Sequence, residues 1–293
     1  MRDFIKFREN LLKARLEFKG PQPTLEESRS GVFMKEFYEV SDGVKVKENT
    51  IAGIEVLDIT PQKITSDYYV IYIHGGGYSL GDPSSETSYP TEFMKQLEAK
   101  GISIRYRLSP EHPFPNGLDD VLTVYKEVIK TIDPKKVILI GCSAGGGLTV
   151  STCLKMLEDN IHVPRVIVLL SAWLDLKGEL PSYTENRAID ALLNYDFVSE
   201  KANEYAEGNL NHPLLNPLTY DLSGFPETFA QVGGHEMLRD DSVYFTERLT
   251  KFGVKNKLDL FEDGFHSWQL FNNHMTESQT SLLNAVNYIK NIK

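Results

Sequence analysis

A serine flanked by glycines follows a run of apolar residues near the middle of the chain. Val137 to Ile140 leads directly into Gly141-Cys142-Ser143-Ala144-Gly145, and residues 148–158 then have helical spacing. Strand, tight turn and helix is the context in which a strained serine exposes its hydroxyl, and glycines on either side avoid a Cβ clash. The pattern therefore predicts Ser143 as a nucleophile. A Gly/Ser-rich loop that merely caps a helix fits the same letters.

Two stretches offer backbone N–H groups that could hold the negative charge of an attacked carbonyl. The Ala144 N–H lies at the start of the predicted helix, where an oxyanion can be held. His74-Gly75-Gly76-Gly77 follows a second apolar strand, and glycines let the backbone approach a ligand closely. Such a loop upstream of G-x-S-x-G indicates the second half of an oxyanion hole. A glycine-rich hairpin fits less well because no paired strand follows, and we expect His74 to fix the loop.

A general base must stand on a loop at the carboxyl edge of the sheet, where Ser143 is exposed. Gly264-Phe265-His266 follows the last predicted strand, and the chain order serine, acid, histidine also selects His266. His162 and His212 follow no strand end, and His274 is near a helix start. The sequence therefore predicts His266 as the base.

The acid that orients the base is expected on the loop after the preceding strand. That loop contains Glu236 and Asp240, and both are candidates. Asp240 immediately precedes a predicted helix, where an aspartate caps the helix and complements its dipole. Glu236 has no such structural role, so we favour it as the partner of His266.

The elements that must position these residues alternate along the chain. Short apolar strands are expected at 69–73, 102–106, 137–140, 166–170, 228–232 and 257–261, with helices at 91–100, 118–131, 148–158, 242–252 and 276–292. Antiparallel strands are expected before them, at 34–40, 44–47 and 53–59. The alternation predicts an α/β fold with a mostly parallel sheet covered by helices on both faces.

Two segments do not fit this alternation, and we expect them to form a small helical cap on a single domain spanning 1–293. The first is 1–33, with an amphipathic helix at 3–18 and a second helix from Thr24, whose capping box would be completed by Glu27. The second is 178–212, which is too long for a bare loop and contains helical stretches at 186–193 and 199–207.

Composition excludes several classes of protein. The 293 residues carry a formal net charge of −10, which argues against nucleic acid or an anionic membrane as partner. No apolar run is long enough to cross a bilayer, and the first ten residues lack the apolar core of a signal peptide. The two cysteines, Cys142 and Cys153, are separated by a helix and are not expected to bridge. We therefore expect a cytoplasmic location.

Five motifs in this order resemble the hormone-sensitive-lipase-like branch of the α/β-hydrolases. They are His74-Gly-Gly-Gly-Tyr, Tyr106-Arg-Leu-Ser-Pro-Glu-His-Pro-Phe-Pro115, Gly141-Cys-Ser-Ala-Gly-Gly, Gly233-Gly-His-Glu-Met-Leu-Arg-Asp-Asp and Gly264-Phe-His. The resemblance implies an α/β-hydrolase fold, Ser143 as nucleophile and His266 as base. It also implies Gly76, Gly77 and Ala144 as oxyanion donors. Two positions depart from the family: Cys142 precedes the serine where Asp or Thr is usual, and Glu236 takes the place of an aspartate.

The expected activity is hydrolysis of small, short-chain carboxylic esters through an acyl-enzyme, with no cofactor or metal. Amidase, formamidase, lactonase or peptidase activity on the same residues stays open, as does a non-catalytic ligand-binding homologue. A homodimer is also left open. Arg107 and Glu111 are expected to form an ion pair that holds the oxyanion loop. An acyl pocket could be lined by Tyr78, Trp173, Phe197, Leu214 and Trp268.

Overall fold

One eight-stranded sheet organises the chain, whose computed structural model describes residues 3–20, 24–29 and 35–292. The strand order is β1-β2-β4-β3-β5-β6-β7-β8. β1 pairs antiparallel with β2, and β2 antiparallel with β4, whereas all the remaining neighbours are parallel. The strands are β1 (Val44–Ile51), β2 (Ile54–Pro61), β3 (Tyr69–Ile73), β4 (Lys100–Ile104), β5 (Val137–Cys142), β6 (Val166–Leu170), β7 (Glu227–Gly233) and β8 (Asn256–Phe261).

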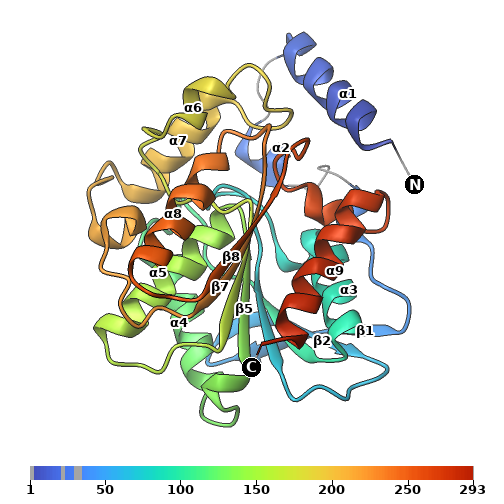
Figure 1. Ribbon diagram of the computed structural model, residues 1–293, viewed down its shortest axis with the longest axis vertical. Helices are drawn as coiled ribbons and strands as arrows, with labels where there is room; N and C mark the ends of the chain where they lie inside the picture. Colours follow the sequence, from blue (N-terminus) through green and yellow to red (C-terminus); the bar gives the residue numbers. More distant parts are fainter. Residues whose placement is uncertain (1–2, 21–23, 30–34, 293) are drawn as a thin grey trace.

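Helices cover both faces of the sheet, which gives three layers (Figure 1). On one face lie α3 and α9, and on the other α4, α5 and α8. Both faces of the central strands are buried, as their continuous apolar sequences require. The α-helices are α1 (Phe4–Glu17), α2 (Leu25–Arg29), α3 (Ser88–Leu97), α4 (Asn116–Val128), α5 (Ala144–Glu158), α6 (Ser182–Glu185), α7 (Tyr195–Ala206), α8 (Arg239–Lys251) and α9 (Thr276–Lys290). The predicted α/β-hydrolase fold is thus confirmed.

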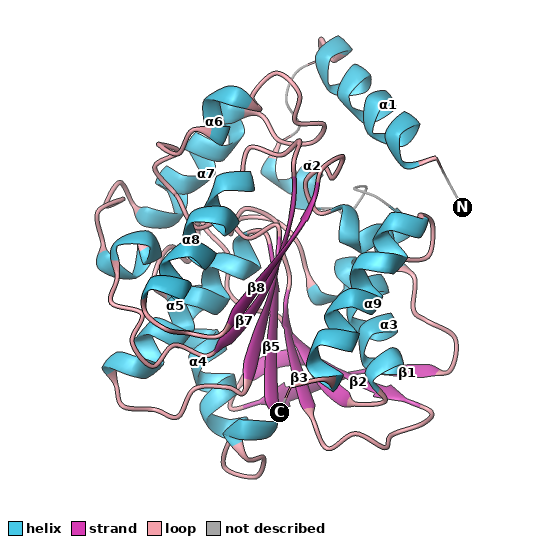
Figure 2. Ribbon diagram, viewed as in Figure 1, coloured by secondary structure: helices cyan, strands magenta, loops and turns pink. Residues whose placement is uncertain are grey.

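The parallel strands bring the chemistry-bearing loops together. β3, β5, β6, β7 and β8 run in the same direction, so their carboxyl ends lie at one edge of the sheet (Figure 2). The glycine-rich loop follows β3, Ser143 follows β5, Glu236 follows β7 and His266 follows β8. This edge is where open α/β sheets build their sites.

The strand expected at 34–40 is wrong. Residues Lys35–Tyr38 form a short 3₁₀ turn, and Met34 lies outside the described residues. The apolar residues serve packing instead: the rings of Phe37 and Phe271 pack edge-to-face, with the centroids 4.9 Å apart. β1 consequently has β2 as its one strand neighbour and forms an edge of the sheet.

The N-terminal helices lie at the edge of the sheet that carries the chemistry-bearing loops (Figure 1). In α1, Phe4 is buried with its ring centroid 5.3 Å from that of Phe265. The capping box expected before α2 is present, because Thr24 N–H donates to Glu27 and the Thr24 hydroxyl accepts from Glu27 N–H.

The insertion at 178–212 contains α6 and α7, which lie above the same edge. The helical stretch expected at 199–207 belongs to α7, but the helix expected at 186–193 is wrong. There the Asp190 carboxylate accepts from the N–H groups of Leu192 and Leu193, at 2.9 and 2.8 Å. A side chain that binds these backbone groups competes with helical hydrogen bonding, so the segment turns.

Candidate active site

Ser143 occupies a strained turn between β5 and α5. Its φ is 51° and its ψ −119°, and the helix begins at the next residue, Ala144. A Cβ on Gly141 would come within 2.3 Å of Gly145 O, and one on Gly145 within 2.2 Å of Ile73 O. Both glycines are therefore required for the turn, which strains the serine and presents its hydroxyl at the sheet edge.

A chain of hydrogen bonds joins three of the predicted residues. His266 Nε2 lies 3.0 Å from Ser143 Oγ, and His266 Nδ1 lies 2.8 Å from Glu236 Oε2. Ser143 is 8% exposed, His266 5% and Glu236 0%. A neutral His266 with its proton on Nδ1 donates to the carboxylate and accepts from the serine hydroxyl, which is the arrangement that a general base needs.

The Glu236 carboxylate is also held on its other oxygen. Oε1 accepts from the Ser171 hydroxyl at 2.9 Å and from the N–H of Gly233. Ser171 Oγ in turn accepts from Ser267 N–H at 3.2 Å, which links the acid to the loop that carries the base. Sequence reasoning missed Ser171. The sequence feature that could have indicated Ser171 is one it shares with Ser143: a polar residue directly after a buried strand.

Two residues of the insertion hold the acid loop from above. Asn186 Nδ2 donates to the backbone oxygens of Gly234 and Glu236, at 2.9 and 2.8 Å. Asp190 Oδ2 accepts from Met237 N–H at 2.8 Å. Neither was predicted, because their partners lie almost 50 residues away along the chain.

Asp240 lies elsewhere, and its expected role as a cap of its own helix is wrong. α8 begins at Arg239 with Leu238 as its N-cap and no side-chain capping bond. Asp240 Oδ2 accepts instead from Ser182 N–H at 3.0 Å, at the start of α6, and Oδ1 accepts from Arg239 Nε at 2.7 Å. The carboxylate thus joins α8 to the insertion.

The glycine-rich loop presents backbone donors next to Ser143. Gly76 and Gly77 have φ of 108° and 61°, and a Cβ on Gly76 would come within 2.2 Å of Leu80 O. Among the described residues, the N–H groups of Gly76, Gly77 and Ala144 have no hydrogen-bond acceptor. Three backbone donors are thus available to a ligand at this edge.

His74 supports that loop. It is fully buried, its ring stacks on Tyr106 with centroids 4.3 Å apart, and Nδ1 lies 2.8 Å from Gly75 O. Burial lowers the pKa of His74 to about 4, so the ring is neutral at neutral pH and its Nδ1–H donates to Gly75 O.

The expected ion pair between Arg107 and Glu111 is wrong, because each residue pairs with a different partner. Arg107 binds Asp120, with Nη2–Oδ1 at 2.7 Å. Glu111 pairs with Arg29 of α2 at 2.7 Å, and Arg29 also donates to the backbone oxygens of Ser79 and Ser109. Arg29 therefore connects the N-terminal segment to the chain just after the glycine-rich loop.

Aromatic side chains enclose the space beside the loop. Tyr78 stacks on Tyr205 of α7, with centroids 3.8 Å apart and an interplanar angle of 2°, and lies 5.4 Å from Trp173. Phe197 of α7 also lies near Gly77, since a Cβ there would be 3.7 Å from its ring. Trp268 does not belong to this group. It is fully buried against Phe261, in a separate cluster that includes Phe4.

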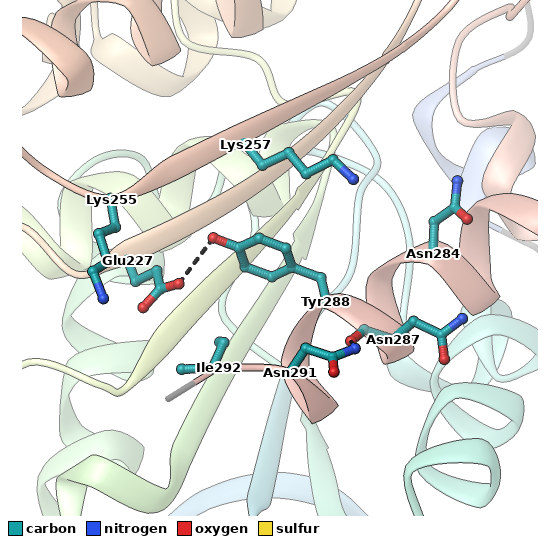
Figure 3. A pocket seen from close by; sticks show the side chains of 8 residues that line it. All are labelled: Glu227, Lys255, Lys257, Asn284, Asn287, Tyr288, Asn291 and Ile292. Carbon is teal, nitrogen blue, oxygen red and sulfur yellow. Dashed lines mark hydrogen bonds between the residues drawn. The ribbon is translucent and has the colours of Figure 1, made fainter.

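A shallow hollow of about 510 Å³ lies far from Ser143, between the amino ends of β7 and β8 and the end of α9 (Figure 3). Its floor includes Tyr288, whose hydroxyl donates to Glu227 at 2.9 Å. In the described part of the chain, no group of three or more His, Cys, Asp or Glu could hold a metal ion. No helix in those residues has both the length and the apolar character that crossing a bilayer requires.

Comparison with known proteins agrees with the fold. The α/β-hydrolase fold family matches residues 70–270, so the chain belongs to that family. A solved hormone-sensitive lipase from a metagenome library superposes with a TM-score of 0.92 at 30% identity, over 98% of this chain and 97% of that one. More particularly, then, the chain is a member of the hormone-sensitive-lipase-like branch.

Curated relatives specify the chemistry. An esterase from Acinetobacter venetianus is 29% identical over 248 residues, which cover 84% of this chain and 82% of the relative. An acetyl-hydrolase from Streptomyces hygroscopicus is 30% identical over 215 residues, 73% and 72% of the two chains. The protein is a carboxylic-ester hydrolase.

Proposed function

We propose that the protein hydrolyses short-chain carboxylic esters with Ser143, His266 and Glu236 as a catalytic triad. The observation that carries this proposal is the hydrogen-bonded chain from Ser143 Oγ through His266 to Glu236, with distances of 3.0 and 2.8 Å. A strained serine, a base and a buried acid in this order are the parts of a serine hydrolase.

In the proposed reaction, Ser143 Oγ attacks the ester carbonyl carbon while His266 Nε2 takes its proton. The N–H groups of Gly76, Gly77 and Ala144 stabilise the oxyanion, and Glu236 stabilises the imidazolium. The tetrahedral intermediate collapses as His266 gives the proton to the leaving alcohol. Water, activated by the same histidine, then attacks the acyl-enzyme, and Ser143 is released with a carboxylic acid.

The preference for short acyl chains rests on the aromatic wall beside the glycine-rich loop. Tyr78, Trp173 and Tyr205 are each no more than 3% exposed, and the Tyr78 hydroxyl lies against Gly147, one turn after Ser143. A Cβ on Gly147 would come within 2.1 Å of that hydroxyl. Side chains packed this closely leave little length for an acyl chain, so we expect acids of roughly C2–C8 to be preferred.

We also propose that the N-terminal segment 1–33 and the insertion 178–212 act together as a cap, with residues 1–2, 21–23 and 30–33 of the first lying outside the described residues. The support is contact with the loops that carry the reacting groups. Arg8 of α1 donates to Asp263 Oδ1 at 3.0 Å, and α7 lies over Gly77, where a Cβ would be 3.5 Å from Lys201 Cγ. Substrate would then bind beneath both segments.

The test is Ser143→Ala, which removes the nucleophile and leaves the turn. Hydrolysis of p-nitrophenyl butyrate should fall by at least about 10⁴-fold, while circular dichroism and the melting temperature stay near wild type. The exposed Ser223→Ala is the matched control and should keep full activity. Appreciable activity in Ser143→Ala would refute the triad. Matched esters and amides of butyric acid, assayed in parallel, distinguish an esterase from an amidase.

A further inference from the structure

Glu86 is a buried carboxylate that the proposed reaction does not use. It closes the short turn Pro83–Glu86 after the glycine-rich loop and is 8% exposed. Oε1 accepts from Gly75 N–H at 3.0 Å, and Oε2 accepts from the Tyr72 hydroxyl at 2.8 Å. Among the described residues it forms no ion pair. A buried carboxylate without an ion-pair partner is costly, so its presence needs an explanation.

The position of Glu86 is close to the nucleophile but not in contact with its hydroxyl. Gly75 stands between them: a Cβ on Gly75 would lie 3.2 Å from Glu86 Oε1 and 3.3 Å from both Ser143 Cβ and Cys142 O. Glu86 therefore makes no hydrogen bond to Ser143 or His266, and its contact beside the nucleophile is the peptide of Gly75.

That peptide is held at both ends. Glu86 accepts from its N–H, and the Tyr106 hydroxyl donates to its carbonyl oxygen, His74 O, at 2.9 Å. Because a peptide unit is planar, fixing both polar groups fixes its orientation. The orientation of the glycine-rich loop is thus set at its first residue.

Hydrogen bonds to the carbonyl oxygens also fix the orientation of the next two peptides. Gly75 O accepts from His74 Nδ1, and Gly76 O accepts from the N–H groups of Ser79 and Leu80. In a trans peptide the N–H points away from the carbonyl oxygen. Because the carbonyl oxygens of Gly75 and Gly76 point toward these donors, the N–H groups of Gly76 and Gly77 point away from them and are free to donate.

The turn that carries Glu86 is itself fastened to the sheet. Arg105, directly after β4, binds Asp82 through Nε and Nη2 and also pairs with Glu48 and Glu55 of β1 and β2. Asp82 caps the turn by accepting from Ser84 N–H at 2.8 Å. Glu86 is consequently presented to Gly75 from a fixed support.

We propose that Glu86 is a positioning residue that aligns the oxyanion donors by holding the N–H of Gly75. This inference rests on the proposed function, because it assigns Gly76 and Gly77 as donors to the oxyanion. Glu86 touches neither substrate nor reacting atoms. Its loss should weaken stabilisation of the transition state more than binding of the substrate, because the oxyanion forms only as the serine attacks.

The test compares three substitutions at this position. Glu86→Met keeps the length but removes the acceptor, and Glu86→Asp withdraws the acceptor by one methylene while keeping the charge. Both should lower kcat by about 10- to 100-fold with KM changed less than about 3-fold. Glu86→Gln keeps an acceptor oxygen for Gly75 and should stay within about 3-fold of wild type. Glu92→Met, a half-buried glutamate on α3, is the control and should leave kcat unchanged.

A trifluoromethyl ketone, whose adduct with the serine carries an oxyanion, gives a second readout. Its inhibition constant should rise in Glu86→Met and Glu86→Asp by the same factor by which kcat falls. In Glu86→Gln the inhibition constant should stay near the wild-type value. If Glu86→Met does not fold, Glu86→Asp carries the comparison. Wild-type kcat in the folded Met or Asp variant, or equal losses in Gln and Met, would overturn the inference. Activity in Ser143→Ala would refute the proposed function, whereas an inactive Ser143→Ala beside a fully active Glu86→Met refutes this inference alone.

Discussion

Three residues from three different segments hold the Glu236 carboxylate. One oxygen accepts from His266 Nδ1, and the other from Ser171 and Gly233, so rotation of the carboxylate would break bonds on both oxygens. The side chain is fully buried. A carboxylate held in this way favours one tautomer of the histidine, with the proton on Nδ1 and the lone pair of Nε2 facing Ser143.

Glu236→Gln should leave the protein folded and lower kcat by about 10³- to 10⁴-fold. The amide can meet His266 with its NH₂ group, which would favour the wrong tautomer, and it cannot stabilise the imidazolium. Steady-state kinetics with p-nitrophenyl butyrate measures the effect.

Asp240→Asn is the matched comparison for this variant. It removes the charge beside Arg239 but retains an oxygen for Ser182 N–H, so kcat should stay near wild type while stability falls by roughly 0.5–2 kcal/mol. Chemical denaturation measures the loss. A large loss of kcat in Asp240→Asn with little loss in Glu236→Gln would exchange the two roles.

The positions of Ser143, His266 and Glu236 were predictable because each follows an apolar strand, and parallel strands end at one edge. The contacts of Ser171, Asn186 and Asp240 were not. Their partners come from segments that adjoin only after the insertion has folded back onto the sheet, and nothing in the local sequence records that contact.

Helix α7 packs beside the glycine-rich loop through Phe197 and Lys201 at Gly77 and through a stacked tyrosine pair at Tyr78. Tyr205 lies flat on Tyr78, and its hydroxyl has no hydrogen-bond partner among the described residues. The ring, rather than the hydroxyl, therefore makes the contact with Tyr78.

Tyr205→Ala should shift the preference toward longer esters, because removing a buried ring opens volume that neighbours refill only in part. We expect the ratio of kcat/KM for octanoate over butyrate esters to rise by about 10-fold, with stability lowered by about 3–5 kcal/mol. Tyr205→Phe keeps the stack and should leave the ratio unchanged. An unchanged ratio in a folded Tyr205→Ala variant would remove α7 from the acyl site.

Strands were easier to predict than turns and cap segments. Val166–Leu170 is five apolar residues in a row, and burial on both faces of a parallel sheet requires that. The alternation at 34–40 was ambiguous, since the same pattern packs Phe37 on Phe271 without strand pairing. Helical spacing at 186–193 was overridden by Asn186 and Asp190, whose side chains bind backbone groups instead.

Stability of the whole protein should depend on pH through its buried acids. Burial raises the pKa of Glu86 from 4.5 to about 7, partly offset by hydrogen bonds from Tyr72 and Gly75. Between these values the folded state holds the proton more firmly than the unfolded chain does, so the free energy of unfolding falls as pH rises. The difference amounts to up to about 3 kcal/mol, from 1.36 kcal/mol per pKa unit.

Glu86→Gln removes this titration while keeping the acceptor. The free energy of unfolding of wild type minus that of Glu86→Gln should be constant below pH 4.5, decline up to about pH 7 and be constant above. Urea denaturation at half-unit pH intervals measures it, and the titration of groups that do not interact with Glu86 cancels in the difference. Parallel stability curves across that range would show that Glu86 titrates with the same pKa in both states.

The two buried thiols can be used to measure local opening of the structure. Cys142 is the last residue of β5 and is 1% exposed, and Cys153 lies in the middle of α5 and is 0% exposed. Burial raises the pKa of both thiols. A disulfide reagent such as Ellman's needs a thiolate that it can reach, and neither thiol supplies one in the folded state. The rate of labelling therefore measures how often the structure opens around β5 and α5, the two elements that hold Ser143 between them.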